Sequence, residues 1–203
     1  LVVGDIATDA AVVVADVVAQ RGRIDLLVNN AGANVGARQL ADLSDEDWDG
    51  MQAVNLRGTF QATRTVASVM AAQDGGSIVC VSSIAARGFR LASNAGYAAM
   101  KGGLISFVQV AAMQLGAAGI RVNCVCPGPT RTESFEDAVR GMAERDGIAV
   151  DAAEAQMVAI FGAALRKVVE PAEVAATIAF LLSDEASAIT GQTLNVDAGL
   201  VYG

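Results

Sequence analysis

Three side chains in the middle of the chain have the types and the spacing needed for proton transfer. Tyr97 and Lys101 are four residues apart, so on a helix both side chains lie on one face. A free tyrosine has a pKa of about 10, and a nearby ammonium stabilises the phenolate and lowers that pKa. Ser83, at the end of the preceding apolar run, is placed to donate a hydrogen bond to the same substrate oxygen. We therefore expect Tyr97 to act as a general acid and base.

Each of these signals also has a plain structural interpretation. A tyrosine near the start of a helix is often an amphipathic surface residue. The pair Ser82 and Ser83 is also typical of a turn. The choice between the two interpretations depends on the elements that surround these residues.

The composition indicates one globular domain. The chain has 203 residues, 53% of them hydrophobic and 18% charged, which is enough for a sizeable core. Its net charge of -8 argues against nucleic acid and against an anionic membrane surface as partners. Cys80, Cys124 and Cys126 lie in apolar runs, which fits core packing in a reducing cytoplasm. Because the chain has no histidine, we expect no metal site.

Apolar runs that alternate with helical patterns predict the secondary structure. We expect strands at residues 1–6, 24–28, 77–82, 120–126 and 193–197, and helices at residues 10–20, 45–70, 97–118, 136–145, 151–165 and 171–182. This alternation predicts a doubly wound α/β fold, in which a parallel sheet has helices on both faces. Ligands of such folds bind beyond the carboxyl ends of the strands.

Two features within this pattern have more than one interpretation. Asn55 lies inside an apolar helix, where it either caps or kinks the helix or positions a water for Lys101. Residues 131–168, called the lid segment below, are expected to cover the substrate. Their apolar side chains indicate a hydrophobic alcohol or ketone, or else simply pack the segment: Phe135, Met142, Met157, Ile160 and Phe161.

The chain resembles the classical short-chain dehydrogenase/reductases (SDRs). The resemblance rests on Asn29-Asn-Ala-Gly32, Val-Asn55-Leu-Arg-Gly-Thr-Phe, Ser82-Ser83, Tyr97-x-x-x-Lys101, Pro127-Gly128 with Thr132, and Ile189-Thr-Gly191. It implies a single Rossmann-like domain over residues 1–203. It also implies an NAD(P)-dependent oxidoreductase that transfers a hydride between the nicotinamide and a carbonyl or secondary alcohol.

The resemblance implies a role for each site residue. Tyr97 would be the acid/base, Ser83 would orient the substrate oxygen, Lys101 would hold the nicotinamide ribose, and Asn55 would anchor a water in a proton relay. NAD or NADP would contact these residues: Asp5 and Ile6 near the adenine, Asn29, Ala31 and Gly32 along the cofactor, Tyr97 and Lys101, Pro127 and Gly128, and Thr130 and Thr132 at the nicotinamide amide and phosphates. Proteins of this family are usually homodimers or homotetramers.

The start of the sequence departs from the family pattern. Leu1 opens the chain directly in an apolar run, and the family's first strand, glycine-rich phosphate turn and second strand do not precede it. We therefore expect an N-terminally truncated sequence that by itself binds the cofactor poorly. The alternative to an enzyme is a non-catalytic remnant that oligomerises or binds a small molecule through the same fold.

Overall fold

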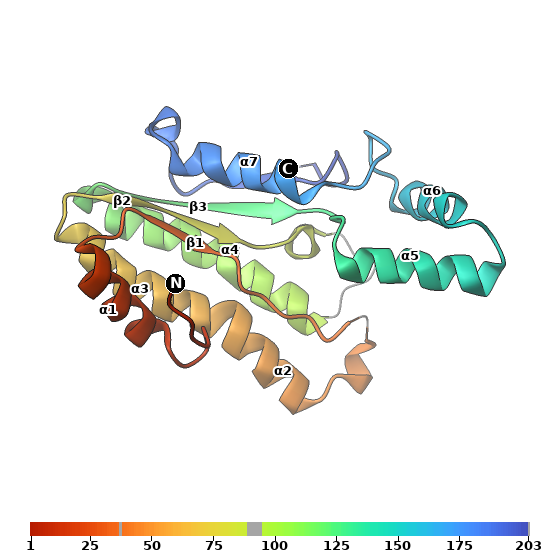
Figure 1. The fold of residues 1–203 in the computed structure, drawn as a ribbon, viewed down its shortest axis with the longest axis horizontal. Helices are drawn as coiled ribbons and strands as arrows, with labels where there is room; N and C mark the ends of the chain where they lie inside the picture. The colour runs from red at the N-terminus through yellow and green to blue at the C-terminus, as the bar shows by residue number, and fades with distance from the viewer. Residues whose placement is uncertain (37, 89–94, 203) are drawn as a thin grey trace.

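A four-stranded parallel sheet lies between two layers of helices in the computed structural model, which describes residues 1–36, 38–88 and 95–202 (Figure 1). The strands follow one another across the sheet in chain order: β1 (Leu26–Asn29), β2 (Gly76–Val81), β3 (Ile120–Pro127) and β4 (Thr193–Val196). All three neighbouring pairs are parallel, so the carboxyl ends of the strands lie at one edge. The predicted doubly wound α/β fold is confirmed.

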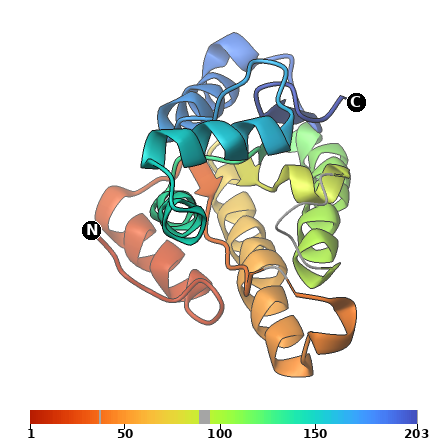
Figure 2. The same ribbon diagram turned by 90° about the vertical axis from the view of Figure 1, so that its right-hand side faces the viewer.

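The helices cover both faces of this sheet (Figures 1 and 2). They are α1 (Ala10–Arg21), α2 (Asp45–Gln52), α3 (Thr59–Ala71), α4 (Ala95–Leu115), α5 (Glu133–Asp146), α6 (Val150–Phe161) and α7 (Pro171–Leu182). Helices α1, α3 and α4 pack on one face and α7 on the opposite face, whereas α5 and α6 extend beyond the carboxyl ends of the strands.

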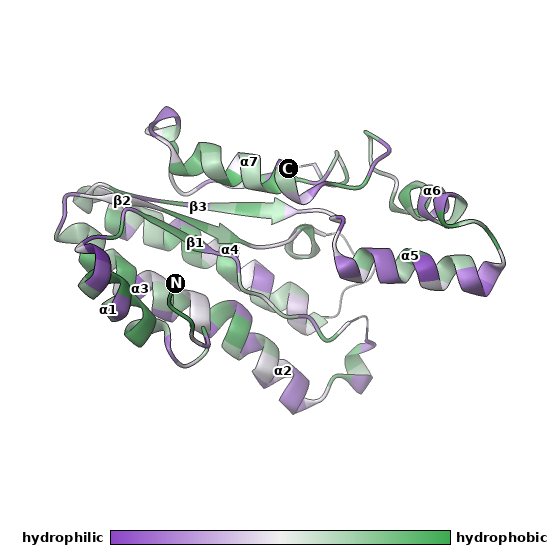
Figure 3. Ribbon diagram, viewed as in Figure 1, coloured by the Kyte–Doolittle hydropathy of each residue, from purple (hydrophilic) through white to green (hydrophobic). Residues whose placement is uncertain are grey.

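The core is divided between the two faces of the sheet. Side chains alternate along a strand, so Cys80 and Cys124 face α3 and α4, whereas Val79 and Val125 face α7. All four are fully buried, as central strands of a doubly wound sheet require. Figure 3 shows the consequence, because the strands and α4 are largely hydrophobic while α5 carries much hydrophilic surface.

Residues 1–6 do not form the predicted strand. A cavity of about 200 Å³ separates residues 2–6 from residues 27–31, and within residues 1–36 the two segments exchange no backbone hydrogen bond. An extended segment that has no neighbouring strand forms no interstrand backbone hydrogen bonds. An apolar, β-branched composition alone therefore does not make it a strand. Instead, the carbonyl of Asp5 accepts hydrogen bonds from the amides of Thr8 and Asp9, in a turn that leads into α1.

The predicted helix over residues 45–70 is interrupted by a π-helical segment at Ala53–Gly58. Ser44 begins α2 as predicted, with its hydroxyl accepting a hydrogen bond from the amide of Asp47. A π-helical segment often marks a functional site, because it releases backbone groups from the regular ladder. Asn55 lies inside this segment, where the regular α-helical hydrogen-bond pattern is interrupted.

The lid segment also differs from its predicted boundaries. Helix α5 begins earlier than expected, because the hydroxyl of Thr132 accepts from the amide of Phe135 and caps it. Helix α6 ends at Phe161, because Gly162 adopts the left-handed conformation with φ of 75°. Pro171 opens α7 at the expected first position.

Helix α4 is the longest helix described. Together with the turn that follows it, residues 95–118 are long and apolar enough to cross a membrane by length and composition, and among the described residues no other helix is. Here α4 packs on the sheet, with Leu104, Val108 and Ala112 buried.

Candidate active site

The predicted site residues meet at the carboxyl edge of the sheet. Asn30 follows β1, Ser82 and Ser83 follow β2, and Gly128 follows β3. Because the strands are parallel and in register, all of these segments leave the sheet at one edge. Helix α4 returns to the same edge and carries Tyr97 within its first turn.

Lys101 is a buried cation at the centre of this edge. Its side chain is 2% exposed, and its Nζ donates to the carbonyl of Val81 at 2.9 Å. This is the one hydrogen bond that its ammonium makes among the described residues, so two N–H donors remain for a ligand. Burial lowers the pKa of Lys101, since the charged form loses its hydration. An ammonium with spare donors fits the hydroxyl groups of a ribose.

Tyr97 and Ser83 border the same cavity, and Lys101 lies next to the Tyr97 ring. Burial raises the pKa of Tyr97, and the hydrogen bond with Ser83 partly opposes that rise. The expectation that Lys101 lowers this pKa is wrong for the protein by itself. Lys101 Nζ lies 5.7 Å from the centroid of the Tyr97 ring, over its face, and desolvation of the phenol is the larger effect. The phenol is therefore protonated at neutral pH and ready to donate.

The two adjacent serines have different surroundings. Ser82 is buried, and its hydroxyl donates to the carbonyl of Lys101 at 2.7 Å. Ser83 borders the cavity that Tyr97 also lines, and its hydroxyl accepts from the amide of Ala85 at 3.1 Å. Successive residues of an extended segment point to opposite sides, which separates the two roles. The Ser82 hydroxyl holds the end of β2 against α4, whereas Ser83 borders the cavity. The contact of Ser82 with α4 was not predicted, although the alternation of side chains along an extended segment indicates it.

Asn55 joins the π-helical segment to the loop after β1. Its side chain is fully buried, and its Nδ2 donates to the carbonyls of Met51 at 2.8 Å and Ala33 at 2.7 Å. Its Oδ1 accepts from the amide of Ala33 at 3.2 Å. A Cβ on Gly32 would lie 3.0 Å from both Asn55 Oδ1 and Lys101 Nζ. The absence of a side chain at Gly32 thus allows the loop to approach the lysine closely.

The residues expected near the adenine and two of those expected along the cofactor line a common cavity. Asp5, Ile6, Asn29 and Ala31 border the space of about 200 Å³ next to β1. The side-chain amide of Asn29 is nevertheless directed into the core, where it donates to Thr63 Oγ1 at 3.0 Å and to Cys80 Sγ at 3.4 Å. The amide of Asn29 therefore stabilises the packing of β1, and only the backbone of this residue remains for a ligand in the cavity.

The residues after β3 border a second cavity, of about 460 Å³. Pro127, Gly128, Thr130 and Thr132 line it, together with Ser83, Tyr97 and apolar side chains of α5 and α6. The Thr130 hydroxyl donates to the carbonyl of Gly128 at 2.9 Å, so it shapes this turn. We call this space the reaction cavity, because it contains the hydroxyl pair at one end.

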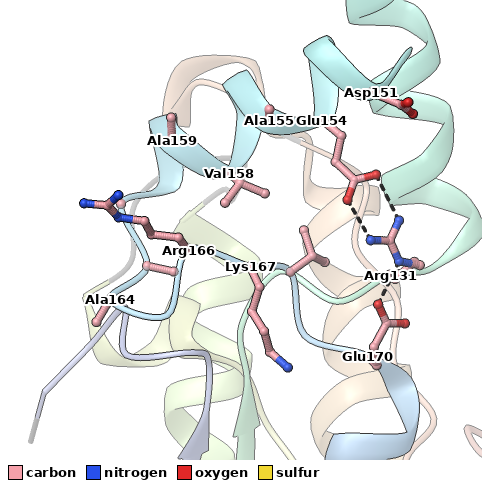
Figure 4. A pocket seen from close by; sticks show the side chains of 13 residues that line it. Arg131, Asp151, Glu154, Ala155, Val158, Ala159, Ala164, Arg166, Lys167 and Glu170 are labelled. Carbon is pink, nitrogen blue, oxygen red and sulfur yellow. Dashed lines mark hydrogen bonds and ion pairs between the residues drawn. The ribbon is translucent and has the colours of Figure 1, made fainter.

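A third cavity, of about 1000 Å³, lies on the other side of α6 (Figure 4). Arg131 is held there between two carboxylates, with a two-point contact to Glu154 at 2.6 and 3.0 Å and a contact to Glu170 at 2.9 Å. Arg131 precedes α5, Glu154 lies on α6, and Glu170 caps α7, so one guanidinium connects three elements. No sequence pattern singled out Arg131, because its partners are far away along the chain.

Comparisons with known proteins agree with this arrangement. The family described as enoyl-(acyl carrier protein) reductase matches residues 2–201. A 3-oxoacyl-(acyl-carrier-protein) reductase of Thermotoga maritima is 40% identical over 192 residues, which cover 93% of this chain and 71% of that protein. The short-chain reductase protein NovJ of Streptomyces niveus is 37% identical over 187 residues, covering 92% of this chain and 68% of NovJ.

A solved structure shows the same fold with a bound coenzyme. An actinorhodin polyketide ketoreductase determined with NADPH superimposes with a TM-score of 0.86 at 32% identity, and the match covers 97% of this chain and 75% of that one. The match extends over the sheet, the helices on both of its faces and the lid segment.

Proposed function

Because this chain belongs to the short-chain dehydrogenase/reductase family of NAD(P)-dependent oxidoreductases, we propose that it reduces a ketone to a secondary alcohol with Tyr97 as the proton donor. The observation that carries the proposal is the meeting of Ser83 and Tyr97 at the wall of the reaction cavity, with buried Lys101 beside the Tyr97 ring. The similarity to an oxoacyl reductase and to a ketoreductase with NADPH supports reduction as the direction and NADPH as the coenzyme.

The proposed reaction balances as one hydride and one proton. The reduced nicotinamide, when bound, supplies the hydride to the carbonyl carbon. Tyr97 gives its phenolic proton to the carbonyl oxygen, and Ser83 donates a hydrogen bond to that oxygen as negative charge develops on it. In the reverse direction Tyr97 takes the proton from the alcohol. A raised pKa suits the forward direction, because the phenol is protonated at neutral pH.

Lys101 and Asn55 support this step. The two spare N–H donors of Lys101 would hold the nicotinamide ribose, and its charge would stabilise the phenolate that remains after proton transfer. Asn55 would act on the position of the loop through Ala33, and one lone pair of its Oδ1 remains for a water in the proton relay.

The cofactor contacts belong to the same proposal. Asp5 and Ile6 would border the adenine, and the backbone of Asn29, Ala31 and Gly32 would follow the middle of the cofactor. The segment after β3 would hold the nicotinamide end, through Pro127, Gly128, Thr130 and Thr132.

We also propose a cytoplasmic homo-oligomer. The outer faces of α3 and α4 carry apolar side chains that contact water, with Phe60 41%, Val110 50% and Met113 76% exposed. A second copy would cover this face. Three free, buried thiols are consistent with a reducing compartment.

The test is coenzyme-dependent turnover by the gene product that contains this sequence. Oxidation of NADPH and of NADH would be followed by absorbance with a panel of ketones. Tyr97→Phe should lower kcat by about 10²- to 10⁴-fold. The matched control is Tyr202→Phe, because Tyr202 is the other tyrosine and is 81% exposed. Equal rates for both variants would disprove the assignment of Tyr97. Absence of turnover in the unsubstituted protein would favour the non-catalytic alternative.

A further inference from the structure

The reaction cavity has no charged side chain in its described lining. Its wall on the lid segment is formed by Ser134 and Ala138 and by larger apolar side chains, among them Phe135, Met142, Met157 and Phe161. Tyr97 is the one ionisable group among the described residues that border it. The polar groups on the opposite wall are hydroxyls and an amide, none of which neutralises a charge.

The charges of the lid segment lie elsewhere. Figure 4 shows Arg131, Glu154 and Glu170 paired with one another in the third cavity, on the far side of α6. On α5, Arg140 pairs with Asp137, and all of these groups are at least partly exposed. The segment thus presents one uncharged face to Tyr97 and one charged face to the other side.

This division selects against charged substrates. A carboxylate, phosphate or ammonium that entered the reaction cavity would lose water and gain no opposite charge from the described residues that line it. An apolar substituent would instead exchange water for aromatic and thioether contacts. Methionine side chains are flexible, so Met142 and Met157 can adjust to rings and branched chains of different shape.

We propose that the group delivered to Tyr97 is a neutral ketone with an apolar substituent, and that Ala138, Met142 and Met157 determine which substituents enter. This inference rests on the proposed ketone reduction and adds its substrate class. The uncharged described lining of the reaction cavity, with the ion pairs of the lid segment outside it, is what carries it.

The experiment compares two ketones that differ in charge. Ethyl 3-benzoylpropionate is neutral and 3-benzoylpropionate is a stable anion, while the reacting carbonyl and the phenyl ring are the same. We expect kcat/KM for the ester to exceed that for the acid by about 100-fold or more. Binding of both compounds would be measured in parallel by calorimetry, with the ester binding and the acid not.

Two lysine variants provide the matched comparison. Ala138→Lys places a cation on the wall of the reaction cavity at an exposed position, and should lower the ratio of ester to acid by about threefold to fivefold. Ala159→Lys adds the same charge on α6 toward the third cavity, and should leave the ratio unchanged.

The outcomes separate this inference from the proposed function. Equal or better turnover of the acid would overturn the neutral substrate class while ketone reduction stands. Binding of the ester alone, without turnover, would support the substrate class and contradict the proposed reaction. Binding of neither compound, or the same change of ratio in both variants, would overturn the inference.

Discussion

Replacing Asn55 with alanine should lower the free energy of unfolding by about 3 kcal/mol, the sum for three hydrogen bonds of about 1 kcal/mol each. The amide makes all three in a fully buried position, two to Ala33 and one to Met51. The loss removes the side-chain partner of the buried carbonyl of Met51 in α2 and frees the loop after β1 at Ala33. The effect therefore exceeds that of an ordinary polar deletion at the surface.

The measurement is urea unfolding followed by far-ultraviolet circular dichroism and by the fluorescence of Trp48, the single tryptophan. With a denaturant slope of about 2 kcal/mol per molar, the midpoint should fall by about 1.5 M. Ala33 follows Gly32, where an added Cβ would lie 3.0 Å from Lys101 Nζ, so the variant should also lower kcat by more than its folded fraction explains.

Asn123→Ala is the matched control. Asn123 is also fully buried, and its side chain makes two hydrogen bonds, to the carbonyl of Ile189 at 2.8 Å and from the amide of Gln192 at 3.0 Å. Its loss should cost about 2 kcal/mol without changing kcat. A stability loss below about 1 kcal/mol for Asn55→Ala would refute the stabilising role of its three hydrogen bonds. Equal effects of both variants on kcat would refute the coupling of Asn55 to Lys101.

Three further predictions concern the acid, the lid segment and the start of the sheet. The rate of ketone reduction should stay level through neutral pH and fall as the pH rises through the raised pKa of Tyr97, because the protonated phenol is the proton donor. A rate that falls as the pH is lowered below neutral would contradict this prediction. Arg131→Met should lower the free energy of unfolding by about 1 kcal/mol at low salt and by less at high salt, since the ion pair of Arg131 with Glu154 is partly exposed. A difference in melting temperature between the variant and the unsubstituted protein that does not change with salt would contradict this prediction. Gly75→Ala should lower the free energy of unfolding by about 2 kcal/mol or more, because Gly75 has φ of 128° and a Cβ there would lie 2.7 Å from the carbonyl oxygen of Gly119. An unchanged urea midpoint would show that the backbone can shift without a loss of stability.

The sequence by itself determined the order of the elements and the chemistry at their ends. Apolar runs alternating with helical patterns predict a parallel sheet, and parallel strands bring their carboxyl ends to one edge whatever the details of packing. The positions of Ser83, Tyr97 and Lys101 followed from this rule, since one residue ends a strand and the other two share a helix face. These are local patterns, which a sequence states directly.

The tertiary structure decided the properties that depend on neighbours distant in the chain. Residues 1–6 have the composition of a strand, but within the described part of the chain they have no paired neighbour. The amide of Asn29 faces the core, and the pKa of Tyr97 rises through burial even with a lysine beside its ring. Hydrogen-bond partners and desolvation are set by long-range packing, and for that reason the uncharged and charged sides of α6 became visible only in the folded protein.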